Sequence, residues 1–146
     1  MRGRIAAMGV GAVVSFTALA GCGGEPSVPA ATATPGPGVG TVTTAADGVQ
    51  EITLQTQDDY VFTPNTFTVD PGAVRLTVVN AATDMTHNFR FRPHTGPAAI
   101  AEEIPLLAPG DKKTIEFTVT EPGDYPFECS FHVQLKQVGT MTVRGG

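Results

Sequence analysis

Short runs of alternating apolar and polar residues, separated by turn signals, fill the chain from Val49 to Gly146. Successive side chains of a strand point to opposite faces, so this period of two indicates strands with one buried face. Turn segments such as Asp70-Pro71-Gly72 supply the reversals. Runs of this length and spacing predict an all-β fold, an antiparallel sandwich or barrel. The runs span residues 51–55, 66–69, 74–80, 87–91, 113–119, 125–128 and 138–144.

One segment, residues 96–107, breaks the alternation. We expect it to be a crossing loop between the two sheets, with at most one or two helical turns. The whole stretch 49–146 is about 98 residues long, which is enough for a single domain with one core.

A low-complexity stretch precedes this domain. Residues 23–48 are mostly Gly, Pro, Ala, Thr, Ser and Val, with hardly a charge or an aromatic ring. Such a composition cannot bury enough apolar surface to fold, so residues 22–48 are predicted to be a flexible linker.

The N-terminal residues 1–21 have the form of a signal peptide. Arg2 and Arg4 precede an apolar stretch that is too short to span a membrane and that ends in small residues. The segment Leu19-Ala20-Gly21-Cys22 resembles the lipobox of bacterial lipoproteins. That resemblance implies export, an acylated Cys22, and a lipid anchor on the outer face of the bacterial cell membrane or in the periplasm. The alternative is an ordinary secretory signal in which Cys22 is incidental.

The charge of the mature chain excludes some partners. Loss of residues 1–21 leaves seven of the nine basic residues against fourteen acidic ones, a formal charge of about −7. An acidic domain of this kind is a poor nucleic-acid binder. It also has no electrostatic attraction for anionic lipid, so the expected contact with the membrane is the lipid on Cys22.

Cysteine usage points to a metal. With Cys22 committed to lipid, Cys129 has no partner for an intrachain disulfide. An exported protein normally pairs its thiols, so a lone thiol suggests a soft metal ion as its occupant. The alternative is a buried structural thiol.

Further donors accompany this thiol. His132 follows Cys129 after two residues, and Gln137 precedes the last predicted strand. His87 begins another predicted strand 42 residues before Cys129 (129 minus 87). Two imidazoles, one thiolate and a weak axial donor are the trigonal ligand set of blue copper. Zinc also suits Cys and His, but copper has the higher intrinsic affinity. A metal-free adhesion domain of immunoglobulin type would share the sandwich without explaining these donors.

The domain resembles the cupredoxin family, the kin of plastocyanin and azurin. The segments that carry the resemblance are Tyr60-Val61-Phe62-Thr63-Pro64, Val69-Asp70-Pro71-Gly72, Thr86-His87-Asn88-Phe89 and 125–143. It implies a Greek-key β-sandwich and one type 1 copper ion held by His87, Cys129 and His132. The family's axial Met falls on Gln137, as in the stellacyanin branch, and Met141 or water is the alternative axial ligand.

The same resemblance assigns further roles. Asn88 is expected to fix the thiolate by hydrogen bonding, and Phe131 and Leu135 to form an apolar docking patch around His132. The loop departs from the family at Phe131, where Pro is common, and at Lys136, where Gly is usual. His94 lies among turn formers and is predicted to be an ordinary surface residue.

The implied function is one-electron transfer to a redox partner protein at the cell envelope, performed by a monomer. The alternative is copper sequestration or delivery at the cell surface without a fast redox partner. Three His residues are too few for a multicopper oxidase or a dinuclear copper enzyme, so no enzymatic activity is expected.

Overall fold

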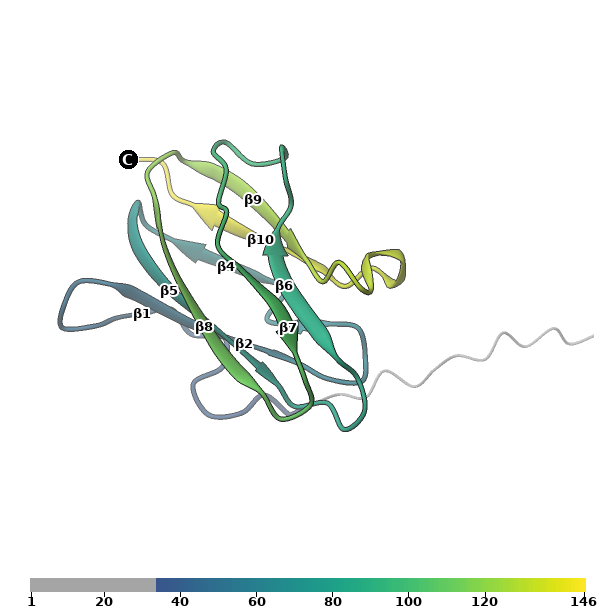
Figure 1. Ribbon diagram of the computed structural model, residues 1–146. Coiled ribbons are helices and arrows are strands. Elements are labelled where there is room, and N and C mark those ends of the chain that lie inside the picture. Colours follow the sequence, from purple (N-terminus) through teal and green to yellow (C-terminus); the bar gives the residue numbers. More distant parts are fainter. Residues whose placement is uncertain (1–33) are drawn as a thin grey trace, which may run out of the picture.

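The computed structural model describes residues 34–146, so the predicted signal peptide and Cys22 lie outside the described residues. Within the described part, two β-sheets face each other (Figure 1). The first sheet has the order β1-β2-β5-β8 with β3 also on β2, and its strands are β1 (Thr43–Thr44), β2 (Gln50–Thr56), β3 (Phe62–Thr63), β5 (Gly72–Asn80) and β8 (Lys112–Val119). The second has the order β4-β10-β9-β6-β7, and its strands are β4 (Thr66–Val69), β6 (His87–Phe91), β7 (Glu103–Leu107), β9 (Gly123–Glu128) and β10 (Val138–Val143). The predicted β-sandwich is confirmed.

The strand directions differ in part from the prediction. Most pairs are antiparallel, but β2 pairs with β5 in parallel, and so does β4 with β10. After β2 the chain forms β3 on the first sheet, crosses to the other sheet at β4 and returns at β5, and this crossing lets β5 run in the same direction as β2. Both sheets are therefore mixed.

The ordered domain reaches into the predicted linker. Gly36 donates its backbone N–H to Oε1 of Gln55 over 3.0 Å, and Val39 forms a bridge with Thr53. Strand β1 then pairs with β2, and the side chain of Val42 packs against the core. Composition alone predicts this segment to be unfolded, because it carries few apolar side chains. Backbone pairing with the edge of β2 orders it here.

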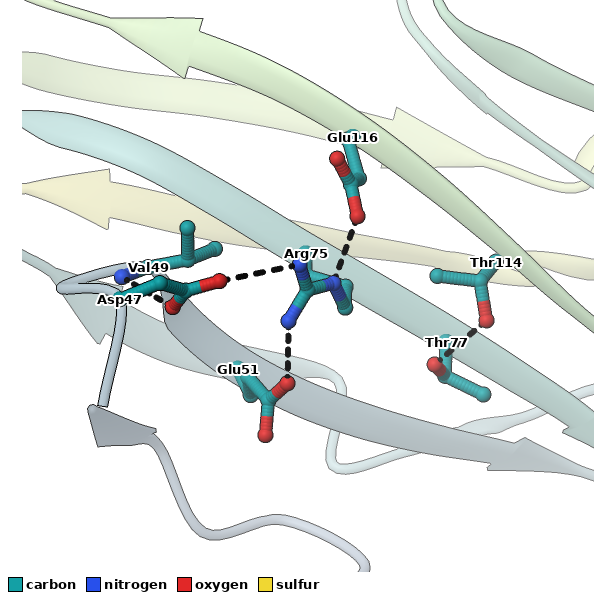
Figure 2. Close-up of polar contacts among 7 residues, drawn as sticks. All are labelled: Asp47, Val49, Glu51, Arg75, Thr77, Thr114 and Glu116. Carbon is teal, nitrogen blue, oxygen red and sulfur yellow. Dashed lines mark hydrogen bonds and ion pairs between the residues drawn. The ribbon is translucent and has the colours of Figure 1, made fainter. Parts of the chain in front are cut away.

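A cluster of charged side chains secures the turn after β1 (Figure 2). Arg75 on β5 lies 2.6 Å from carboxylate oxygens of both Glu51 and Glu116, and 3.5 Å from Asp47 in the turn. The guanidinium thus bridges β2, β5 and β8 on the outer face of the first sheet. Exposed ion pairs contribute little free energy individually, so their main effect is to fix orientation.

The predicted crossing loop contains a strand. Residues 103–107 form β7, which pairs with β6, and no helix occurs in residues 92–102. Ile104 and Leu107 are the buried residues of this strand, and they are spaced by three because the ladder is irregular opposite His87 and Phe89. The irregularity removes the period of two, which is why the alternation fails in this segment.

The core lies between the sheets and is rich in aromatic rings. The aromatic side chains predicted to be core are all buried: Phe62, Phe67, Phe89, Phe117, Tyr125 and Phe127. At one end of the sandwich β2 ends, β6 begins, β9 ends and β10 begins, as the strand pairings require. No helix within residues 34–146 has the length and apolar character needed to cross a membrane.

Candidate metal centre

The predicted donors come together at this end of the sandwich. His87 is the first residue of β6, Cys129 directly follows β9, and His132 lies in the loop that continues from Cys129. One ligand atom from each of these three residues lies within 4.8 Å of the others. Gln137 joins them as the residue immediately before β10 and is fully buried.

The side chains meet through specific atoms. Oε1 of Gln137 lies 2.9 Å from Nδ1 of His87 and 3.0 Å from Nδ1 of His132. Nδ1 of His132 lies 3.5 Å from Sγ of Cys129. Both imidazoles thus direct Nδ1 to the same point as the thiol and the amide oxygen.

The imidazole of His87 carries its proton on the opposite nitrogen. Nε2 lies 2.8 Å from the carbonyl oxygen of Gln57, which can only accept a hydrogen bond. Burial lowers the pKa of His87, because a desolvated imidazolium is unfavourable, so the ring is neutral at neutral pH. Nδ1 therefore presents a lone pair. A metal-binding His commonly fixes its other ring N–H in this way.

A hydrogen bond from outside the donor cluster also fixes the orientation of the Gln137 amide. Its Nε2 donates to Oγ1 of Thr56 over 2.6 Å, which leaves Oε1 facing the two imidazoles. Two acceptor atoms, Nδ1 of His87 and Oε1 of Gln137, consequently lie 2.9 Å apart in a buried place. Lone pairs in such proximity repel each other unless a cation is bound between them. The donor set of two imidazoles, a thiol and an amide oxygen fits a copper ion.

Cys129 is completely buried, and Asn88 contacts it. The backbone N–H of Asn88 donates to Sγ over 3.4 Å. The side chain of Asn88 also holds the ligand loop, because Nδ2 donates to Oγ of Ser130 over 2.6 Å and Oδ1 accepts from the Ser130 N–H over 2.7 Å. Asn88 thereby links the start of β6 to the residue that follows the thiol.

The loop between Cys129 and Gln137 closes through its own backbone. The N–H of His132 donates to the carbonyl of Cys129, and a short 3₁₀ helix, η1 (Val133–Leu135), follows. Lys136 ends this helix with φ 62°, in the left-handed region. This conformation explains why a Gly is usual here in the family that the sequence resembles, since Gly adopts it without steric cost.

Apolar side chains surround the exposed edge of His132. Phe131 and Leu135 are 51% and 53% exposed, while His132 itself is partly buried. The ring of Tyr60 meets that of His132 edge to face with centroids 5.0 Å apart, and its neighbour Val61 is 42% exposed. The predicted patch of Phe131 and Leu135 therefore lies next to His132, one of the clustered donors. Tyr60 is a contact of His132 that sequence reasoning missed.

Two other candidates lie apart from the donors. Met141 is buried in the middle of β10 opposite Tyr125, four residues beyond Gln137, or roughly 13 Å along an extended strand. His94 lines a cavity of about 460 Å³ beneath the loop between β6 and β7.

Sequence reasoning also missed the end of β2. Thr56 orients the amide of Gln137, and the carbonyl of Gln57 orients the ring of His87. No sequence signal marks these residues, because one acts through a backbone carbonyl and the other through a common hydroxyl.

Comparison with known proteins agrees with this geometry. A family model described as "Cupredoxin-like domain" matches residues 31–143, which is most of the chain. Plastocyanin A/B of Petroselinum crispum is 37% identical over 97 residues, covering 64% of this chain and 98% of that protein. A chloroplastic plastocyanin of Oryza sativa subsp. indica is 39% identical over 88 residues, covering 57% of this chain and 54% of that protein, so the alignment spans about half of its length.

Solved structures show the same fold. Reduced auracyanin from Roseiflexus castenholzii superimposes with a TM-score of 0.58 at 25% identity, covering 65% of this chain and 97% of that one. The match of the family model over residues 31–143 and the relationship to plastocyanins lead to one conclusion: this chain belongs to the cupredoxin-like domain family.

Proposed function

We propose that this protein is a blue copper protein that carries single electrons, with His87, Cys129 and His132 as equatorial ligands and Gln137 as the axial ligand. The observation that carries the proposal is the 2.9 Å approach of two lone-pair atoms, Nδ1 of His87 and Oε1 of Gln137, beside the buried thiol of Cys129. Copper bound to such a set supplies a reversible one-electron couple.

The chain's own residues supply the rest of that function. Cys129 and Gln137 are fully buried, which supports exclusion of water from the site. Hydrogen bonds from outside the donor set hold His87 and Gln137, so the donors are preorganised and little rearrangement is needed between two oxidation states. His132 reaches the surface among Phe131 and Leu135, which makes this patch our proposed docking face for a redox partner protein.

The test is spectroscopic. We expect residues 34–146 with added Cu(II) to show an intense visible thiolate-to-copper band and narrow hyperfine splitting in electron paramagnetic resonance. Both should vanish in Cys129→Ser and persist in His94→Gln, the control for a His outside the donor cluster. A colourless wild-type protein with ordinary copper signals would contradict the proposal.

Electron transfer and copper storage use the same ligands, and the rate of electron self-exchange separates them. A carrier is expected to exchange electrons quickly between its oxidised and reduced forms. Replacing Phe131 by Glu should slow this exchange, since two copies can no longer bring their apolar patches together. Slow exchange in the wild type would favour the sequestration alternative.

We also propose that the protein acts at the cell envelope, anchored by lipid on Cys22. The support is the sequence Leu19-Ala20-Gly21-Cys22 after a short apolar segment, together with the Cys129 thiol that a metal would occupy in an oxidising compartment. Metabolic labelling with a radioactive fatty acid should mark the full chain and should fail with Cys22→Ala. Equal labelling of both would contradict the anchor.

A further inference from the structure

The carboxylate of Asp58 binds three consecutive backbone N–H groups from a distant part of the chain. Oδ2 accepts from Thr83 over 2.7 Å, and Oδ1 accepts from Asp84 over 3.2 Å and from Met85 over 3.0 Å. These partners lie 25 to 27 residues away in sequence, in the loop that leads into β6. Hydrogen bonds to an ionised acceptor are stronger than neutral ones, so this contact fixes the loop firmly.

Both ends of that contact lead directly to His87. The residue before Asp58 is Gln57, whose carbonyl accepts the Nε2–H of His87 over 2.8 Å. The last of the three donors, Met85, lies two residues before His87. The carboxylate of Asp58 therefore connects Gln57, whose carbonyl orients the imidazole of His87, to the loop that leads directly into His87.

The loop is held from the inside as well. The buried side chain of Asn80 donates to the carbonyl of Met85 over 2.8 Å and accepts from the N–H of Ala82 over 3.0 Å. Asn80 belongs to β5 and thus to the first sheet, whereas Asp58 holds the loop from the exposed side. With Asp58 removed, the contacts of Asn80 and the hydrogen bond from the N–H of Ala81 to the carbonyl of Thr56, over 2.8 Å, would still hold the start of this loop, but Thr83 and Asp84 would lose the contact that fixes them.

The negative charge of Asp58 also interacts electrostatically with the imidazole of His87. The three N–H donors, Thr83 foremost, hold the pKa of Asp58 below its usual value despite the opposing effect of burial, so the group is ionised at neutral pH. A fixed negative charge near the ring of His87 stabilises positive charge there. It would favour the more highly charged of two metal oxidation states.

We propose that Asp58 is a positioning residue for the metal centre, which holds Nδ1 of His87 toward the other donors and favours the oxidised metal. The part that concerns oxidation states rests on the proposed copper function. The part that concerns position rests on the protein alone and can be tested without metal.

The neighbouring Asp59 provides a matched control. Within residues 34–146, its Oδ1 accepts only from the N–H of Val61, over 3.1 Å and two residues away, so it makes a local turn and no link to the loop before β6. Asp59→Asn removes the same charge as Asp58→Asn from the adjacent position. Asp59→Ala likewise matches Asp58→Ala.

The first experiment uses the metal-free protein, residues 34–146. In Asp58→Ala we expect amide hydrogen exchange at Thr83 and Met85 to be roughly tenfold faster or more, because each loses a charge-assisted hydrogen bond. The nitrogen resonances of the His87 ring should also lose the pattern of a single Nε2–H tautomer. Asp59→Ala should change neither readout. Unchanged exchange and an unchanged tautomer in Asp58→Ala would overturn the positioning role.

The second experiment uses the copper-loaded protein. The reduction potential should rise in Asp58→Asn by more than in Asp59→Asn, and the hyperfine splitting should change in Asp58→Ala but not in Asp59→Ala. Equal shifts in the two Asn variants would mean that only surface charge matters and would overturn the assigned effect on oxidation state. A wild type without type 1 signals would refute the copper function, while the exchange result would still decide the positioning role.

Discussion

Oε1 of Gln137 lies 2.9 Å from Nδ1 of His87, and each atom faces the other with a lone pair because its partner nitrogen is engaged elsewhere. In the proposed copper site, this relationship would make the amide oxygen the fourth donor. An amide oxygen is a harder ligand than a thioether and favours the higher oxidation state of copper.

Replacing Gln137 by Met should therefore raise the reduction potential. A tenfold change in the relative affinity for the two oxidation states corresponds to about 59 mV for one electron, and we expect a shift of at least about this size. Voltammetry of the copper-loaded variant measures it. Met141→Leu, a similar-sized change of the buried Met on β10, should leave the potential unchanged. No shift in Gln137→Met would mean that Gln137 is not a ligand.

Thr56 should be needed to hold the amide of Gln137. Thr56→Val keeps the volume but removes the acceptor 2.6 Å from Nε2, which leaves a buried amide without that partner. An unsatisfied buried donor costs about 1–3 kcal/mol, so denaturant unfolding of the metal-free variant should show a loss of this size. Thr56→Ser should restore most of it.

Thr77 provides the matched control for that change. Its hydroxyl lies 2.8 Å from that of Thr114 on the outer face of the first sheet (Figure 2). Thr77 is itself buried, whereas Thr114 is exposed. Thr77→Val should cost less than about 0.5 kcal/mol, because the hydroxyl left behind on Thr114 is exposed and can hydrogen-bond to water instead. Equal losses for Thr56→Val and Thr77→Val would contradict the orienting role of Thr56.

The donors were predictable from the sequence because their chemistry is in the residue type. A thiol with an imidazole three positions later and a second imidazole on another predicted strand has few other uses in an all-β domain. Thr56, Gln57 and Asp58 were not predictable. They act through a side-chain hydroxyl, a backbone carbonyl and a carboxylate, respectively, and each contacts a residue 25 or more positions away. Residues of these types are common in turns, and only the folded chain shows what they contact.

The fold divides in the same way. Strands with one buried face were predictable from the period of two, whereas β7 was not, because the irregular ladder spaces Ile104 and Leu107 by three. Composition likewise predicts the segment with Val39 and Val42 to be part of the linker. This segment is ordered by backbone hydrogen bonds to the edge of β2, and backbone pairing cannot be predicted from amino-acid composition.

Lys136→Gly should stabilise the domain. Lys136 has φ 62°, a conformation that costs an L residue roughly 1–2 kcal/mol, while the greater freedom of unfolded Gly offsets part of the gain. We expect a net increase of about 0.5–1 kcal/mol in the free energy of unfolding. Gln134→Gly, two residues earlier in η1, should be destabilising instead, since that position needs no left-handed backbone. A loss of stability in Lys136→Gly would show that the Lys side chain makes a compensating contact.

Glu128, the residue before the buried thiol, should make stability depend on acid pH. Its side chain is only 6% exposed, and its oxygens accept from Arg90 over 2.7 Å and from Arg92 over 3.0 Å. Burial would raise the pKa of Glu128, but these hydrogen bonds and charges outweigh it and lower the pKa below the ordinary 4.5. The carboxylate therefore contributes its stabilisation fully above about pH 4.5, and this is lost as the pH falls through the lower value in the folded protein.

Glu128→Gln should remove this dependence. At neutral pH the variant should be about 1–3 kcal/mol less stable, because charge-assisted hydrogen bonds to two guanidinium groups are lost. Between neutral pH and pH 3 its free energy of unfolding should fall less steeply than that of the wild type, so the two curves converge in acid. Urea unfolding of the metal-free proteins across this range measures both curves. Parallel curves would show that Glu128 has the same pKa in the folded and unfolded chain, and that its two Arg partners do not stabilise the end of β9.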